Sequence, residues 1–205
     1  MKEIKSKKIN VKDVFNEWYT VPSYQRHYVW EEDNITALLE DVKENYIERA
    51  DEEYFLGSYI IQSKDGNNDL LDGQQRITTL FLLFAFLRDY EKTQDQFRDV
   101  FQKYIYQAEQ PMEGIDERVR LSYEIRGNVK SFINDFIIPK SSITENWNLI
   151  EEKALDIKEN LSIQHICKAL RCFKKFFDEN DDIDLIKFVK FINVNLVMIN
   201  ISADT

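Results

Sequence analysis

The chain has 205 residues, of which 43% are hydrophobic, so it can bury a substantial core without disulfides or a structural metal. Its net charge of −10, from 37 acidic and 27 basic residues, disfavours tight DNA binding by this chain alone, because the overall field repels a phosphate backbone. The longest fully apolar run, residues 80–87, is too short to span a bilayer, which excludes an ordinary membrane-spanning helix.

Cysteine usage and the amino terminus suggest a cellular compartment. Cys167 and Cys172 are five residues apart in a helical pattern, so their side chains point about 140° away from each other and cannot form a disulfide together. No basic segment followed by an apolar one opens the sequence. We therefore expect a protein of the reducing cytoplasm.

The first elements in chain order are short. The lysine-rich residues 2–8 are expected to form a polar tail that leads into a short helix around residues 11–18. Residues 19–21 predict a strand, and the aromatic, polar residues 22–30 predict an ordered loop. Apolar side chains at helical spacing over residues 35–46 then predict an amphipathic helix.

A β-hairpin and a buried helix are expected next. Residues 54–63 carry aromatic and β-branched side chains, residues 65–68 supply turn chemistry, and residues 69–71 resume an apolar run. Residues 77–90 are apolar on every side, which predicts a core helix. The segment Asp72-Gly73-Gln74-Gln75-Arg76 therefore lies at a strand-to-helix junction.

From residue 94 onward the pattern is mainly helical. Residues 118–123 predict a short strand, residues 139–142 a loop and residues 183–191 a further helix. The apolar, β-branched residues 194–201 predict a buried strand, and its place at the end of the sequence suggests a truncated chain. Two apolar stripes predict the main helices: Val129, Phe132, Ile133, Phe136 and Ile137, then Ile163, Ile166, Leu170, Phe173 and Phe177.

The junction at residues 72–76 has the chemistry of a phosphate-binding turn. Phosphate binds where backbone amides converge at a helix start beside a cationic side chain, and Gly73 permits the tight turn that Arg76 follows. Gln74 and Gln75 supply amide donors, and Asp72 could hold a magnesium ion, a ribose hydroxyl or an attacking water. In the alternative interpretation, Asp72 only caps the helix, Gly73 only turns the chain and Arg76 is solvated. The five residues alone favour that alternative.

The loop at residues 22–30 adds a second candidate region. It places Gln25 and Arg26 between Tyr24 and two further aromatic residues, Tyr28 and Trp30, a mixture suited to stacking on a base while contacting phosphate. The alternative is that the aromatic side chains only anchor the loop to the core.

Three segments together resemble a known family. Pro22-Ser-Tyr-Gln-Arg-His-Tyr-Val-Trp30, Tyr54-Phe-Leu-Gly57 and Leu71-Asp-Gly-Gln-Gln-Arg-Ile-Thr-Thr-Leu80 resemble the N-terminal domain of GmrSD-type restriction endonucleases, over residues 18–88. The resemblance implies an α+β fold with a ParB/sulfiredoxin-like core at residues 1–92, followed by a mainly helical extension at residues 93–205.

The same resemblance implies a nucleoside triphosphate with Mg²⁺, and an HNH nuclease domain or subunit as partner in a system that acts on modified or phage DNA. The implied catalytic residues are Asp72, Gln75 and Arg76, with Asp72 also holding the metal. The implied nucleotide-binding residues are Tyr24, Gln25, Arg26, Gly73, Gln74 and Thr78.

The chain also departs from the family pattern. His27 lies in the loop motif and His165 in a helical segment, so we expect no HNH site and no DNA cleavage by this chain. A stretch with Phe, Leu-Asn and Arg-Gly that usually follows the last strand is missing, which puts part of the nucleotide site in doubt. Arg120 and Arg126 could supply further phosphate contacts.

Three functions remain open from sequence. The first is a nucleotide-hydrolysing regulatory domain, the second a non-hydrolysing nucleotide switch or protein-interaction module, and the third a DNA-binding module. A homo-oligomer is compatible with the sequence. The first function makes a geometric prediction: Arg26 and Arg76 should face one cleft beside Gln25 and Asp72, with an aromatic ring nearby, because the strands that precede them can lie in one sheet.

Overall fold

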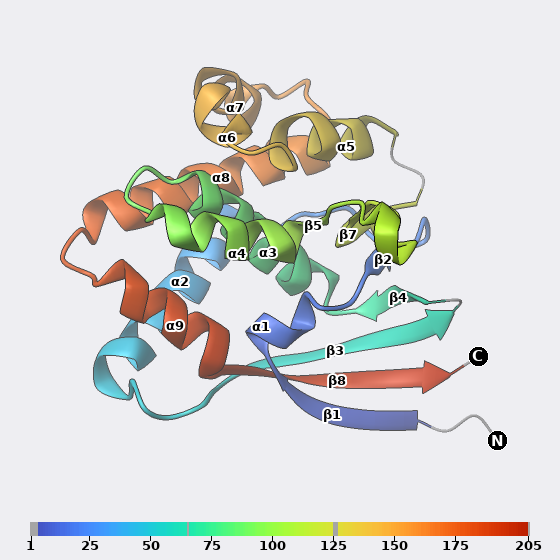
Figure 1. Ribbon diagram of the computed structural model, residues 1–205. Helices are drawn as coiled ribbons and strands as arrows, with labels where there is room; N and C mark the ends of the chain where they lie inside the picture. Colours follow the sequence, from blue (N-terminus) through green and yellow to red (C-terminus); the bar gives the residue numbers. More distant parts are fainter. Residues whose placement is uncertain (1–3, 65, 125–126, 205) are drawn as a thin grey trace.

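The computed structural model describes residues 4–64, 66–124 and 127–204. A six-stranded mixed sheet lies on one side of the molecule and the helices pack against it and above it (Figure 1). The strands, in their order across the sheet, are β1 (Ile4–Asn10), β8 (Leu196–Asp204), β3 (Tyr54–Lys64), β4 (Asn67–Asp72), β2 (Tyr19–Val21) and β7 (Leu121–Tyr123).

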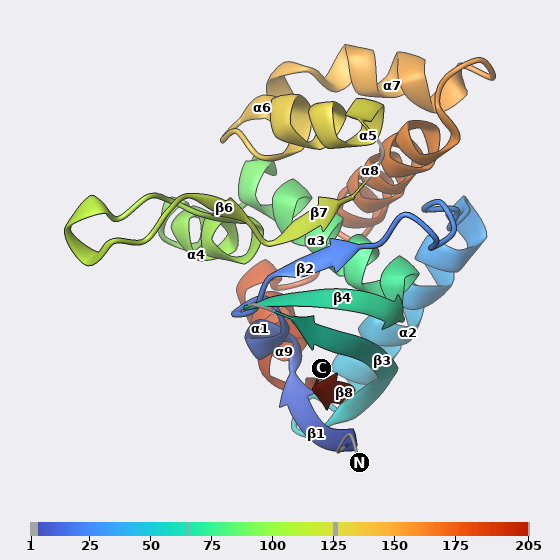
Figure 2. The same ribbon diagram turned by 90° about the vertical axis from the view of Figure 1, so that its right-hand side faces the viewer.

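The strand directions confirm the expected α+β class. β3 and β4 form the predicted antiparallel hairpin, and β8 runs parallel to β3 and antiparallel to β1. β2 runs parallel to both β4 and β7. Figure 2 shows β2 and β4 ending on the same side of the sheet, so the segments that follow these two strands begin near each other.

The predicted core helix is α3 (Gln74–Asp89), and it is buried along nearly its whole length. Its residues are apolar around the full circumference, since it packs on the sheet, on α4 (Asp95–Ile105) and on α8 (Leu161–Glu179). The predicted amphipathic helix is α2 (Glu32–Glu48), which buries Ile35, Leu39 and Val42. A helix buried on all sides places its amino-terminal end at a fixed point beside the sheet.

The remaining helices are shorter and lie mostly in the second half of the chain. They are α1 (Val11–Val14), a 3-10 helix (Pro111–Glu113), α5 (Gly127–Phe132), a π-helix (Ile133–Ile137), α6 (Ser142–Glu145), α7 (Trp147–Leu155) and α9 (Leu185–Val194). α5 to α8 form the upper part of the molecule in Figure 1, away from β1, β3 and β8. Within the described ranges, no helix combines the length and the hydropathy needed to cross a membrane.

Two sequence predictions for the amino-terminal end of the chain are corrected. The lysine-rich start is β1 rather than a polar tail, and the helix that follows covers only Val11–Val14. β1 exists because its backbone pairs with β8 along the register from Ile4↔Ala203 to Asn10↔Val197, a distant pairing that exposed lysines do not signal. β8, predicted as a strand, lies inside the sheet, so the expected extension adds a strand to the expected core. The domain division itself stays a prediction.

Segment 118–123 is also corrected, because it forms two strands in different sheets. β6 (Arg118–Val119) pairs with β5 (Tyr106–Gln107) in a separate two-stranded arm that projects at the left of Figure 2, whereas β7 joins the main sheet. The predicted loop at residues 139–142 ends one residue early, since Ser142 begins α6. The predicted hairpin turn includes Asp65, which lies outside the described residues.

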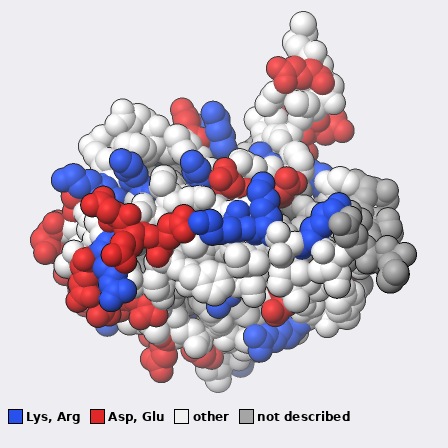
Figure 3. Space-filling view, turned by 90° about the horizontal axis from the view of Figure 1, so that it is seen from below, with Lys and Arg blue, Asp and Glu red and all other residues white. Residues whose placement is uncertain are grey.

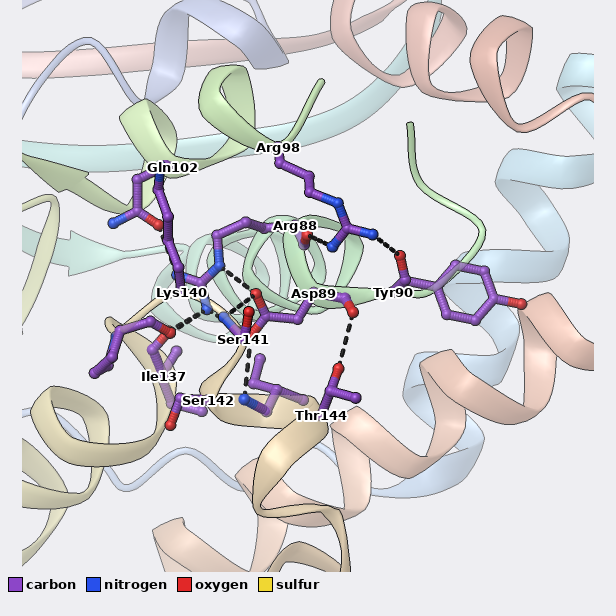
Figure 4. A network of polar contacts seen from close by, with 12 residues as sticks. Arg88, Asp89, Tyr90, Arg98, Gln102, Ile137, Lys140, Ser141, Ser142 and Thr144 are labelled. Atoms are coloured by element: carbon purple, nitrogen blue, oxygen red, sulfur yellow. Dashed lines mark hydrogen bonds and ion pairs between the residues drawn. The ribbon is translucent and has the colours of Figure 1, made fainter. Parts of the chain in front are cut away.

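A buried ion pair ties the end of α3 to the helical part of the molecule (Figure 4). Arg88, 1% exposed, pairs with Asp89 at 2.7 Å. The Arg88 guanidinium also donates to three consecutive carbonyls, and the Asp89 carboxylate accepts from two backbone amides. The carbonyls belong to Ile137, Ile138 and Pro139, at 3.0, 2.7 and 2.8 Å, and the amides to Ser141 and Ile143, at 2.9 and 3.1 Å.

Candidate functional site

Two segments meet beyond the carboxyl ends of β2 and β4. The site loop, residues 22–30, follows β2, and the turn into α3 follows β4. Together they line a cleft of about 220 Å³, which we call the arginine cleft. Its lining residues are Gln25, Arg26, Trp30, Asp72, Gly73, Gln74, Gln75 and Arg76. The prediction that Arg26 and Arg76 face one cleft, beside Gln25, Asp72 and an aromatic ring, is confirmed.

Gly73 forms the turn that opens α3. Its φ of 81° lies in the left-handed region, and a Cβ at this position would come within 2.5 Å of the Tyr59 Cβ on β3. Gly73 is the N-cap residue of α3, while Asp72 is the last residue of β4 and is exposed. The alternative in which Asp72 caps the helix is therefore wrong, and its carboxylate lies at the cleft instead.

The two glutamines hold the site loop in place. The Gln75 amide donates to the carbonyl of His27 and accepts from the amide of Val29, both at 2.8 Å. The Gln74 Nε2 donates to the carbonyl of Arg26 at 3.0 Å. Both side chains are at least 95% buried. In the structure Gln75 positions the loop backbone through both of its polar atoms, and its catalytic role stays a prediction.

The Gln25 side chain connects the loop to the sheet, since its Nε2 donates to the carbonyl of Leu71 at 2.8 Å. Arg26, the next residue, is exposed at the mouth of the cleft. Arg76 is half-buried and donates a long hydrogen bond of 3.5 Å to the carbonyl of Ser58. The two guanidinium groups thus approach the cleft from a loop and from a helix, an arrangement whose charge and donors suit an anion.

Two residues implied by the family resemblance do not line the arginine cleft. Thr78 is 1% exposed, and its hydroxyl bonds to the hydroxyl of Tyr123 at 2.9 Å within the core. Tyr24 is 70% exposed and is not among the lining residues, and Trp30 supplies the ring that borders the cleft. Thr78 is corrected to a core residue because it lies one helical turn beyond Gln74, on a helix buried on all sides.

The outer side of the site loop rests on α8, a contact that the sequence did not predict. The His27 Nδ1 lies 3.2 Å from the Ser162 hydroxyl. Just beyond the loop, Glu31 pairs with Lys168 at 3.3 Å and lies 3.6 Å from the ring of His165. Burial lowers the pKa of His165, and the nearby Glu31 carboxylate opposes this shift. The helical extension therefore forms the wall behind the loop.

Arg120 does not contribute to the cleft. Its guanidinium stacks on the ring of Trp18 at 4.7 Å and donates to the carbonyl of Asn16 at 2.9 Å. Trp18 precedes β2 whereas the site loop follows it, so Arg120 lies at the opposite end of that strand. Its predicted phosphate contact is wrong for this reason. Arg126, the other arginine considered, lies outside the described residues.

Asp72 is the carboxylate that lines the arginine cleft. The described ranges contain no group of three or more His, Cys, Asp or Glu side chains arranged to hold a metal ion. Mg²⁺ bound with a nucleotide commonly takes one or two protein carboxylates, with phosphates and water as its other ligands. The donor set therefore fits Mg²⁺ that arrives with a phosphate ligand, and does not fit a cation held by the protein alone.

The sequence matches the family model of the GmrSD restriction endonuclease N-terminal domain over residues 3–205. The chain belongs to this family. In this GmrSD N-terminal domain the match includes β1, β8 and the helices of the extension, as well as the motifs at residues 18–88. A search of curated proteins found no match.

Proposed function

We propose that this GmrSD N-terminal domain binds and hydrolyses a nucleoside triphosphate in the arginine cleft, as the regulatory part of a restriction system against phage. The observation that carries the proposal is the convergence of Arg26 and Arg76, 50 residues apart in sequence, at the amino-terminal end of α3. Exposed backbone amides and the helix dipole favour negative charge at such an end. Two arginines add a geometry that suits phosphate oxygens.

The size of the cleft favours the phosphates as the part that it holds. Its volume of about 220 Å³ is below the roughly 300–1,000 Å³ of pockets that enclose a whole ligand. The ribose and base would extend beyond the cleft, where Trp30 and the exposed Tyr24 offer aromatic faces. The four triphosphates differ only in the base. A site that binds the phosphates more tightly than the base is therefore expected to discriminate weakly among them.

Hydrolysis requires water to attack the terminal phosphorus while the bond to the bridging oxygen breaks, which releases phosphate and a nucleoside diphosphate. Arg26 and Arg76 would neutralise the charge on the phosphate oxygens, and the Asp72 carboxylate would orient the water or accept its proton. Mg²⁺ bound with the triphosphate would supply further charge neutralisation. Positioning and electrostatics thus account for most of the expected rate enhancement.

A second candidate is a nucleotide switch that does not hydrolyse its ligand. Gln75 favours it, because both polar atoms of its buried amide are bonded to the backbone of the site loop, which gives this side chain a structural role. In this case binding would tighten the loop against α8 without turnover. Phosphate release distinguishes the two candidates.

The test measures binding of fluorescent triphosphates and release of phosphate with saturating Mg²⁺. Arg26→Ala and Arg76→Ala are expected to weaken binding, whereas Arg49→Ala, at an exposed residue beyond α2, is the matched control and is expected to leave it unchanged. Binding with turnover supports hydrolysis, and binding without turnover supports the switch. If the unaltered protein binds none of the four triphosphates, the proposal is wrong.

A further inference from the structure

The segment Tyr54–Gly57 of β3 has a backbone irregularity beside the arginine cleft. Against β8 the register of β3 shifts between Phe55 and Gly57, which marks a β-bulge. Gly57 has a φ of +126°, a value that residues with a side chain rarely adopt. The bulge therefore requires a glycine at residue 57. The pairing of β3 with β4 does not explain why β3 has a bulge at this position.

The guanidinium of Arg76 fills the space that a side chain at residue 57 would take. A Cβ built on Gly57 would lie 2.7 Å from Nη1, 2.8 Å from Cζ and 3.1 Å from Nη2 of Arg76. All three of the nearest atoms belong to this one group, so its end packs directly on the β3 backbone. The hydrogen bond to Ser58, at 3.5 Å, is too long to fix the group by itself.

The positive charge of Arg76 also acts on Tyr54, the first residue of the same segment. Burial is the main cause of the raised pKa of Tyr54, with Asp41 adding to it, and the positive charge of Arg76 opposes the shift. Arg76 thus lies along the Tyr54–Gly57 segment as well as in the lining of the cleft. β3 thus contacts the site through Arg76, although no residue of β3 is among those that line the cleft.

We propose that Gly57 is a positioning residue, whose bulge seats the Arg76 guanidinium so that it presents its donors to the phosphates in the arginine cleft. This inference rests on the proposed function. An arginine side chain has many rotamers, and fixing one of them before the ligand arrives lowers the entropy lost on binding. A methyl group at residue 57 would displace the Arg76 guanidinium from its position on the β3 backbone, because the end of a flexible side chain moves more easily than the backbone.

The test compares Gly57→Ala with Gly66→Ala. Both glycines have positive φ, but a Cβ at Gly66 would meet nothing within 4 Å, so this control introduces backbone strain without displacing the arginine. Fluorescent-triphosphate affinity and urea unfolding are measured for each variant. Gly57→Ala is expected to weaken affinity at least about tenfold, as for loss of a charge-assisted hydrogen bond, and Gly66→Ala less than about twofold.

A double-mutant cycle separates positioning from general distortion. In an Arg76→Ala background, Gly57→Ala is expected to cause no further loss of affinity, because nothing is left to displace. An equal loss with and without Arg76 would overturn the inference. If Arg76→Ala weakens binding but Gly57→Ala does not, this inference alone fails; if Arg76→Ala has no effect, the proposed phosphate contact of Arg76 fails first.

If Gly57→Ala does not fold, NMR relaxation of arginine Nε–Hε groups in the unaltered, ligand-free protein tests whether the Arg76 guanidinium is held in place. Restricted motion of Arg76 relative to the exposed Arg49 supports a seated guanidinium. Equal mobility of the two groups contradicts it.

Discussion

Arg26 and Arg76 reach the arginine cleft from different elements, and in the proposed function both contact the same triphosphate. We expect replacement of either residue with alanine to cost about 1.5–3 kcal/mol of nucleotide affinity, the range of a charge-assisted hydrogen bond. The double variant should cost less than the sum, since loss of the first contact lets the phosphates shift away from the second. Titration calorimetry of the four proteins measures the coupling. Strictly additive losses would mean that the two arginines do not share a ligand.

Gly73 has a structural role besides its proposed role in nucleotide binding. From sequence alone, Gly73→Val is expected to impair nucleotide binding more than folding. The structure changes this expectation. A Cβ at residue 73 would lie only 2.5 Å from the Tyr59 Cβ, so the valine side chain would push α3 away from β3. We therefore expect Gly73→Val to lose more unfolding free energy than the about 1–3 kcal/mol that backbone strain alone costs. Urea unfolding measures it, and Gly114→Val, at a positive φ with open space, is the control. Equal losses in both variants would contradict the packing argument.

The position of the two arginines could be predicted from sequence because parallel strands end at a common sheet edge. The roles of Gln74 and Gln75 could not, because an amide in the first turn of a helix looks the same whether it faces a ligand or a loop. Their partners are backbone groups almost 50 residues earlier in the chain. The packing of Arg76 on Gly57 could not be predicted for the same reason, since no local pattern shows which side chain lies over a glycine.

At the scale of elements, local periodicity predicted α2, α3, the β3–β4 hairpin and β8. It failed for β1, whose side chains are mostly exposed and whose partner strand is at the other end of the chain. It also failed to separate β6 from β7, because consecutive strands of two sheets form one extended run. Elements defined by their own side chains were predictable, and elements defined by distant pairing were not.

The connection between α3 and the helical part of the molecule gives a stability prediction. Arg88→Met would leave the buried Asp89 carboxylate without its cation and would remove the guanidinium hydrogen bonds to three carbonyls. We expect a loss of about 3–5 kcal/mol of unfolding free energy, the usual result of breaking a buried pair on one side.

The control for this prediction is Lys140→Met. Lys140 pairs with Asp99 at 2.7 Å on the surface, where both side chains are more than half exposed, and its loss should cost much less unfolding free energy than that of Arg88. Urea unfolding of both variants provides the comparison. Similar losses in the two proteins would show that the Arg88 network adds little to stability.

For the whole molecule, charge limits what the chain can do with DNA. Basic and acidic side chains are interspersed on the face shown in Figure 3, and acidic ones gather at its left edge. With a net charge of −10, we expect weak binding in gel-shift titrations at low salt and no cleavage of modified or unmodified DNA with common divalent metals. Cleavage that disappears on replacement of His27 or His165 would show that the chain holds a nuclease site. Tight binding at low salt would favour the DNA-binding alternative.

The position of β8 between β1 and β3 has a consequence for synthesis on the ribosome. β3 ends at residue 64 and its neighbour β8 begins at residue 196, so about 130 residues are added before this pairing can form. At about 5–20 residues per second, the edge of β3 waits roughly 7–26 s for its partner. During that interval the β3–β4 hairpin, which leads into the arginine cleft, exposes the unpaired outer edge of β3. Protection of this edge by a chaperone is therefore expected to raise the yield of the native domain.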